Sequence, residues 1–221
     1  MIKRTIAIAD DHNLFRKGLI SLLKKYKEID VICEAPNGKA LLDCIKQKRP
    51  EVVLLNVQMP VMNGIETLGF IRKKYPDIKV IILSGRKEEK FIYQLMELGA
   101  HAFVNKDSEM EGVVDAIHAV MEKGFFLNDL SQKAMANGMM KSKKDNNPAA
   151  ACFSAREKDV IKLICGQKTI KEIADVLCLS PRTVDTYREN IFQKTGAKNA
   201  VGVVLYAIQH KLFDIQVINP Y

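Results

Sequence analysis

Polar side chains stand at the ends of several short apolar segments of this chain, where they could act on one common ligand. They are two carboxylates, an amide, a hydroxyl and an ammonium, from Asp10, Asp11, Asn56, Ser84 and Lys106. If the segments are parallel strands of one sheet, their carboxyl ends face the same crevice. Oxygen ligands of this kind suit Mg²⁺, which takes one or two protein carboxylates and keeps several waters. We therefore expect a magnesium site at this edge.

Strands and helices must place these side chains together, and residues 4–123 supply the required pattern. Short β-branched runs alternate there with amphipathic stretches. We expect strands at 5–9, 31–35, 52–56, 80–84 and 102–104, and helices near 14–26, 38–48, 64–74, 89–98 and 109–123. The third and fourth runs are continuously apolar, as in parallel strands covered on both faces. Five βα units in series predict an α/β domain with a doubly wound, five-stranded parallel sheet over residues 1–127.

A second, all-α domain is expected after this one. Residues 128–150 lose the periodicity in a Lys- and Asn-rich run, which we interpret as the rest of a helix and a mobile linker. Residues 151–221 have a helical pattern. Capping boxes at Ser154 and Thr169 begin two helices, and Ser180, followed by proline, begins a third. The predicted fold class is therefore α/β followed by a four-helix domain.

The composition is that of a globular protein without a membrane span. Hydrophobic residues make up 48% and charged residues 27% of the chain, and no run of about eighteen apolar residues occurs. The N-terminus has no signal-peptide layout, so we expect a cytoplasmic protein with no membrane partner. The five cysteines show no CxxC spacing and are expected to be reduced, mostly buried thiols. The net charge of +8 is spread along the chain, which fits a DNA-binding protein but does not identify one.

The order of the acidic pair, the hydroxyl and the lysine resembles the receiver domain of bacterial two-component response regulators over residues 3–123. The resemblance implies that Asp11 binds Mg²⁺ directly and Asp10 through water. The side chain at position 56 and the backbone carbonyl of Gln58 would be further ligands. A cognate sensor histidine kinase is the implied signalling partner.

The resemblance also implies a set of groups that respond to an aspartyl phosphate. Ser84 would bond the phosphoryl oxygens and Gly85 would leave room for them. Lys106 would pair with the new charge, and Phe103 would be the switch aromatic that turns inward. The charge of the phosphate would thereby bias a two-state surface of the domain.

Asn56 departs from the family's pattern, because the family carries a phosphoryl-accepting aspartate at this position. An aspartyl carboxylate attacks phosphorus through an anionic oxygen and forms a mixed anhydride, whereas an amide oxygen is a far poorer nucleophile. We expect no phosphorylation, and weaker Mg²⁺ binding because one negative charge is lost. Asn56 is either a deliberate isosteric replacement or native to an atypical receiver that works without phosphorylation. The otherwise complete site favours an engineered or recent change.

The C-terminal pattern is that of a helix-turn-helix, with Ile173 and Ala174 on its packing face. It resembles the LuxR-type DNA-binding domain, and the whole chain resembles a NarL/FixJ-type response regulator. One departure lies at Gly166-Gln167, because the family's glycine usually falls one residue later. We expect a slightly different turn there.

The resemblance implies that residues 181–195 form a recognition helix that contacts an operator in double-stranded DNA. Cations suited to phosphate neutralisation, hydroxyls suited to phosphate contacts and outward residues that could meet base edges all lie in or near it. These candidates are Lys171, Arg182, Arg188 and Lys194; Ser180 and Thr183; and Asp185, Thr186 and Glu189. The last helix, capped by Asn199, has more apolar surface than a small domain can bury, which predicts a homodimer on DNA.

Three classes of function fit these features to different degrees. A DNA-binding transcriptional response regulator accounts for both domains. A phosphorylation-independent receiver that binds DNA constitutively, or that titrates a partner, is the alternative. A metal-dependent phosphatase would use the acidic crevice, but the missing nucleophile argues against an enzyme.

Overall fold

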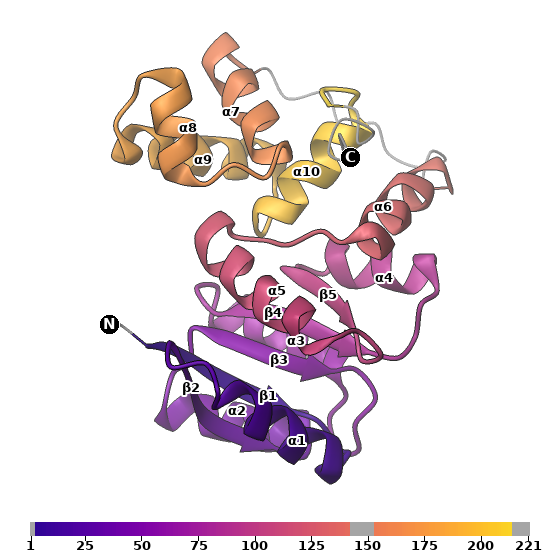
Figure 1. The fold of residues 1–221 in the computed structure, drawn as a ribbon. Coiled ribbons are helices and arrows are strands. Elements are labelled where there is room, and N and C mark those ends of the chain that lie inside the picture. The colour runs from indigo at the N-terminus through magenta and orange to yellow at the C-terminus, as the bar shows by residue number, and fades with distance from the viewer. Residues whose placement is uncertain (1–2, 142–152, 214–221) are drawn as a thin grey trace.

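The computed structural model describes residues 3–141 and 153–213 of the chain, and these form an α/β domain followed by helices (Figure 1). The sheet has five parallel strands in the order β2-β1-β3-β4-β5. The strands are β1 (Arg4–Ala9), β2 (Ile29–Ala35), β3 (Val52–Asn56), β4 (Lys79–Ser84) and β5 (Ala102–Asn105). The predicted doubly wound sheet is therefore confirmed.

Helices cover both faces of this sheet, which explains why its central strands are apolar throughout. The helices are α1 (Asn13–Leu23), α2 (Gly38–Gln47), α3 (Gly64–Lys74), α4 (Glu89–Glu97) and α5 (Met110–Lys123). Helices α1 and α5 pack on one face with alternate residues of each strand, such as Leu54. The intervening residues, such as Leu55, face α2, α3 and α4. Each such fully buried leucine contributes about 1.5–3 kcal/mol of hydrophobic stabilisation.

The expectation that the cysteines are reduced is wrong for one pair. Cys33 of β2 and Cys44 of α2 form a disulfide. Because α2 follows β2 directly and packs against it, the two Cα atoms lie 6.5 Å apart, within disulfide reach. No sequence motif predicts this disulfide, since the contact between the two cysteines depends on how α2 packs against β2. Cys165, by contrast, is a buried thiol whose pKa is raised to about 12 by burial.

The C-terminal helices begin where the sequence predicts. They are α7 (Ala155–Cys165), α8 (Ile170–Leu177), α9 (Pro181–Thr195) and α10 (Ala200–Gln209). Both predicted capping boxes form, and the side chain of Ser180 accepts from the backbone N–H of Thr183 at the start of α9. Before them, α6 (Asp129–Lys141) packs on α4. The remainder of the expected linker lies outside the described residues.

The turn after α7 has the left-handed residue at the position where the family's glycine usually falls. Gln167 has φ 57°, while Gly166 has φ −74°. The N–H of Lys168 donates to the carbonyl of Leu163, and the N–H of Gln167 donates to that of Ile164, as in a Schellman motif. The turn therefore closes as a Schellman motif, and the non-glycine residue Gln167 occupies its left-handed position, which a side chain makes unfavourable.

Helix α10 lies between the other C-terminal helices and the first domain (Figure 1). Its apolar residues, including Val201, Val203 and Val204, are buried. Helices α4 and α6 of the first part of the chain contact α10, in addition to α7 and α9. The apolar surface that predicted a dimer face is therefore covered within this chain in the present structure. Among residues 3–141 and 153–213, no helix combines the length and apolar character that a membrane crossing needs.

Candidate functional site

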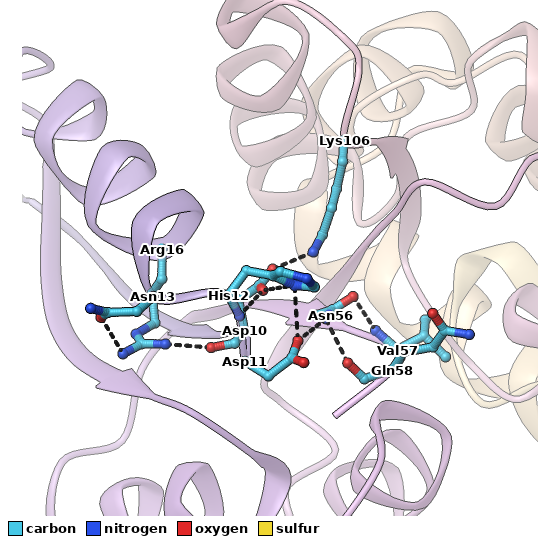
Figure 2. A network of polar contacts seen from close by, with 9 residues as sticks. All are labelled: Asp10, Asp11, His12, Asn13, Arg16, Asn56, Val57, Gln58 and Lys106. Carbon is cyan, nitrogen blue, oxygen red and sulfur yellow. Dashed lines mark hydrogen bonds and ion pairs between the residues drawn. The ribbon is translucent and has the colours of Figure 1, made fainter. Parts of the chain in front are cut away.

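The acidic site assembles at the carboxyl edge of the sheet, as the strand order requires. Asp10 and Asp11 follow β1, Asn56 is the last residue of β3, and Lys106 follows β5. Figure 2 shows these side chains directed toward one another, together with the carbonyl of Gln58. The sequence predicted this convergence because parallel strands end at a common edge.

The side chain of Asn56 is 5% exposed and makes three hydrogen bonds. Its Nδ2 donates to Oδ1 of Asp11 and to the backbone carbonyl of Gln58, both at 2.8 Å. Its Oδ1 accepts from the backbone N–H of Val57, also at 2.8 Å (Figure 2). The amide therefore presents its nitrogen, and not its oxygen, to the predicted metal ligands.

Asp10 is 1% exposed and is neutralised within the protein. The Nζ of Lys106 lies 2.6 Å from Asp10 Oδ2, and the backbone N–H of His12 donates to Asp10 Oδ1 at 2.9 Å. The lysine contact is an ion pair without directed hydrogen-bond geometry, so no described residue donates a hydrogen bond to Oδ2. Sequence reasoning missed Arg16, a buried residue of α1 whose guanidinium donates to the Asp10 carbonyl. A single arginine in an amphipathic helix gives no signal of such burial.

His12 is a second group that sequence reasoning missed. Its Nδ1 lies 3.2 Å from Asp11 Oδ1 and 3.4 Å from Asp10 Oδ1, and the three side chains could hold a metal ion together. Its position directly after the acidic pair was the available signal. The donor set fits a cation in part: the Asp10 and Asp11 carboxylates and the Gln58 carbonyl offer oxygens, and buried Asp10 Oδ2 accepts no hydrogen bond from the described residues. Asn56 does not fit, because its nitrogen faces these oxygens.

Of the predicted phosphoryl-responsive residues, Lys106 belongs to this network through Asp10, whereas Ser84, Gly85 and Phe103 take no part in the contacts described above. Ser84, at the end of β4, is buried and its Oγ accepts from the backbone N–H of Arg86 at 3.2 Å. Gly85 is exposed, with open space where a Cβ would project. Phe103 is fully buried among core residues of the α4 face, so its ring lies inward in this structure. Arg86, not predicted, lines a shallow hollow beside Asp11 with its guanidinium 4.1 Å from the centre of the Phe91 ring.

Most of the predicted DNA-contacting residues lie on an accessible surface of α8 and α9. Ser180, Arg182, Thr183 and Thr186 line one hollow at the start of α9. The other accessible residues are Lys171, Asp185 and Glu189. The helix N-terminus with its capping hydroxyl is suited to an anion such as a DNA phosphate.

Two of the predicted cations are engaged elsewhere. Arg188 pairs with Asp185 at 3.2 Å and lies against Gly124 of the first domain, where its nitrogen is 3.7 Å from the position a Cβ would take. Lys194 Nζ donates to both carboxylate oxygens of Glu157, at 2.8 and 2.7 Å. That ammonium lowers the pKa of Glu157 below its usual value. Lys194 thus ties α9 to the start of α7.

Comparison with known proteins decides what this two-part arrangement is. Residues 6–118 match the family described as response regulator receiver domain. Residues 151–207 match the bacterial regulatory proteins of the luxR family. This chain belongs to the LuxR-type response regulators. The family consists of DNA-binding transcriptional regulators of two-component systems and not of enzymes, and its receivers generally bind Mg²⁺ at an acidic site.

The similarity to individual response regulators extends over nearly the whole chain. The chain is 31% identical to the response regulator GacA of Pseudomonas aeruginosa, over 97% of this chain and 99% of that protein. It is also 31% identical to the probable transcriptional regulatory protein NarL of Mycobacterium tuberculosis, over 96% of this chain and 97% of the relative. The RcsB response regulator of Salmonella typhimurium shares the fold, with a TM-score of 0.57 over 93% of this chain and 100% of RcsB. The 20% identity to RcsB supports the fold alone.

Proposed function

We propose that this response regulator binds DNA with a receiver that is not phosphorylated, because Asn56 occupies the acceptor position. The observation that carries the proposal is the side-chain amide at the end of β3, inside an otherwise complete receiver site. The amide oxygen is a poor nucleophile and also accepts a hydrogen bond from Val57. Ser84, Gly85, Phe103 and Lys106 are the residues that would serve an aspartyl phosphate at this site.

Mg²⁺ would be held by Asp10, Asp11 and the carbonyl of Gln58, more weakly than in a receiver with aspartate at position 56. Asn56 could serve as a ligand only after its amide turned to offer Oδ1. That turn would break three hydrogen bonds. Two carboxylates also attract a divalent cation less than three do.

The proposed DNA surface is the start of α9 with the adjoining part of α8. Lys171 and Arg182 would neutralise phosphates, and the hydroxyls of Ser180 and Thr183 would bond them. Asp185, Thr186 and Glu189 would face base edges, and Arg188 and Lys194 would take part once their present partners release them. Solved relatives include an RcsB–DNA complex and RcsB dimers on DNA. We infer that this chain likewise binds an operator as a homodimer.

We also propose the boundaries of the domains and the cellular location of the protein. The receiver domain would span residues 1–127, the linker 128–150 and the DNA-binding domain 151–221. The protein would act in the cytoplasm, where a cognate sensor histidine kinase reaches the receiver. Without an acceptor aspartate, that kinase would bind the receiver but leave it unmodified.

One observation favours the alternative of a receiver that works without phosphorylation. Each carboxylate of the site already has a partner within the protein, because Asp10 pairs with Lys106 and Asp11 accepts a hydrogen bond from Asn56. The side chains of such a site hold their arrangement without a phosphoryl group. The chain could therefore act as a constitutive DNA-binding or partner-titrating module.

DNA binding is tested by selection from a randomised double-stranded pool, followed by titration of the enriched sequence with and without acetyl phosphate. We expect enrichment of a paired half-site and an affinity that acetyl phosphate leaves unchanged. Absence of any enriched sequence would refute a sequence-specific regulator. An affinity that rises with acetyl phosphate would refute the unphosphorylated receiver.

A further inference from the structure

We propose that the side-chain amide of Asn56 takes the place of a divalent cation in the receiver site. It would hold Asp11 and the Gln58 carbonyl together when no metal is bound. This inference rests on the proposed assignment of those two groups as cation ligands. Asn56 would thus be a positioning residue. With aspartate at position 56, a bound cation would be needed to hold Asp11 and the Gln58 carbonyl together, whereas with asparagine they stay together without one.

The amide nitrogen of Asn56 is placed to bridge two cation ligands. A primary amide carries two N–H donors, and Asn56 Nδ2 aims one at Asp11 Oδ1 and the other at the Gln58 carbonyl, each at 2.8 Å. These oxygens come from two separate loops, after β1 and after β3. The positive end of the amide dipole therefore bridges the two loops that a cation bound to the same oxygens would bridge (Figure 2).

The hydrogen bonds of Asn56 also fix the orientation of its amide. Oδ1 accepts from the backbone N–H of Val57 at 2.8 Å. A turned amide would place Oδ1 against the oxygens of Asp11 and Gln58, and would place the NH₂ group against the Val57 N–H. Every bond in the set would become a repulsion, and buried groups without partners are costly. Asn56 is therefore held with its nitrogen toward the cation ligands.

The charges at this edge of the sheet are balanced without a cation when position 56 carries an amide. Asp10 is paired with Lys106 at 2.6 Å, which leaves Asp11 as the carboxylate that needs a positive neighbour. Asn56 supplies a donor to Asp11, and His12 lies 3.2 Å from the same oxygen. An aspartate at position 56 would instead set a third carboxylate against Asp11 and the Gln58 carbonyl. That repulsion would be relieved by a cation.

The test compares the full-length protein with Asn56→Asp and with Asn37→Asp, each titrated with Mg²⁺ alone. Asn37 caps α2 through its Oδ1, which accepts from Ala40, so an aspartate there adds the same charge and keeps the cap. Calorimetric titration gives the Mg²⁺ affinity, and the thermal midpoint is measured with EDTA and with about 10 mM Mg²⁺.

For Asn56→Asp we expect Mg²⁺ to bind about tenfold or more tightly than it binds the unaltered chain. Its midpoint in EDTA should lie below that of the unaltered chain, and Mg²⁺ should raise it by roughly 3 °C or more. The unaltered chain and Asn37→Asp should shift by less than about 1 °C. Equal Mg²⁺ affinity of the unaltered chain and Asn56→Asp, or an Asn56→Asp midpoint that is not lowered in EDTA, would overturn the proposal.

A second measurement does not depend on any substitution. With ¹⁵N-labelled asparagine, the side-chain NH₂ resonances of Asn56 should exchange slowly with solvent and stay unmoved at a Mg²⁺ concentration that just saturates Asn56→Asp. Rapid exchange, or a shift that is already complete at that concentration, would overturn the proposal. The Mg²⁺ titration and the amide exchange report on the receiver site and not on DNA binding. The present proposal can therefore fail while the proposed DNA-binding function stands, and the reverse is also possible.

Discussion

Asn199 donates a hydrogen bond from its side-chain Nδ2 to the backbone carbonyl of Gly99 at 2.9 Å, and so connects the two domains. The same nitrogen lies 3.3 Å from the carbonyl of Ala100, while its Oδ1 accepts from the N–H of Gly202 and caps α10. Nearby, Arg72 donates to the carbonyl of Lys198 at 3.1 Å. The start of α10 is thus anchored to the receiver by side chains as well as by apolar packing.

Replacing Asn199 by aspartate should loosen this contact between the domains. Aspartate keeps the capping oxygen but places a carboxylate against two carbonyls, and removes both donated bonds. We expect a larger radius of gyration in X-ray scattering and faster amide hydrogen exchange in α10. Asn37→Asp, which changes the cap of α2 in the same way, is the control. An unchanged radius and exchange rate would mean that apolar packing alone holds the domains together.

Two exposed cations of the proposed DNA surface should set part of the salt dependence of binding. Lys171→Ala and Arg182→Ala should each weaken binding to any sequence and reduce the slope of log K against log salt by about one. Lys17→Ala, on an exposed part of the receiver where it pairs with Glu34, is the control and should leave the slope unchanged. An undiminished slope in both DNA-surface variants would place the phosphate contacts elsewhere.

Gln167 should be a position where glycine stabilises the protein. Its φ of 57° lies in the left-handed region, which a side chain makes unfavourable and glycine adopts readily. Gln167→Gly should raise the free energy of unfolding by about 0.5–1 kcal/mol in urea titrations. Gln167→Ala retains a Cβ and should give no such gain. Equal stability of the two variants would show that the turn is not strained at this residue.

His101 should make the protein less stable in mild acid. The ring is fully buried and its Nδ1 accepts from the backbone N–H of Val80; burial, then Lys79 and Arg72, hold the pKa of His101 well below its usual value. In the unfolded chain His101 binds a proton as the pH falls through about 6.5, whereas in the folded protein it stays neutral. The free energy of unfolding is therefore unaffected by His101 above about pH 6.5 and decreases below it. The loss should reach at most about 1.4 kcal/mol per pH unit.

The pH dependence is measured by urea unfolding between about pH 8 and 5. His101→Asn keeps an acceptor for Val80 and removes the titrating group, so its stability should vary less over this range. His118→Gln, at a partly exposed histidine of α5, should retain the dependence of the unaltered chain. A His101→Asn variant with the same acid sensitivity would assign the effect to another group.

The sequence supported those features that depend on local pattern or strand order. The capping boxes at Ser154 and Thr169 were predictable because all their atoms lie within one helical turn. Asp10 and Asn56 were predicted to meet because parallel strands end at one edge. The orientation of the Asn56 amide was not predictable, since it depends on three partners contributed by folding.

Contacts between distant segments gave no sequence signal where they depend on how the helices pack. Asn199 was recognised as a helix cap, but its bonds to Gly99 and Ala100 join positions about a hundred residues apart. Lys194 was predicted to contact phosphate, and its ion pair with Glu157 arises from the packing of α9 on α7. The Cys33–Cys44 disulfide likewise depends on docking of one helix. Long-range side-chain partners therefore required the three-dimensional structure.

We expect Asn56 to prevent phosphorylation of the receiver. The decisive measurement is the intact mass of this chain and of Asn56→Asp after incubation with acetyl phosphate and Mg²⁺. Asn56→Asp should gain the mass of one phosphoryl group and lose it when hydroxylamine is added, while the unaltered chain should gain none. A phosphoryl adduct on the unaltered chain would contradict the claim, as would an Asn56→Asp variant that binds Mg²⁺ and is not phosphorylated.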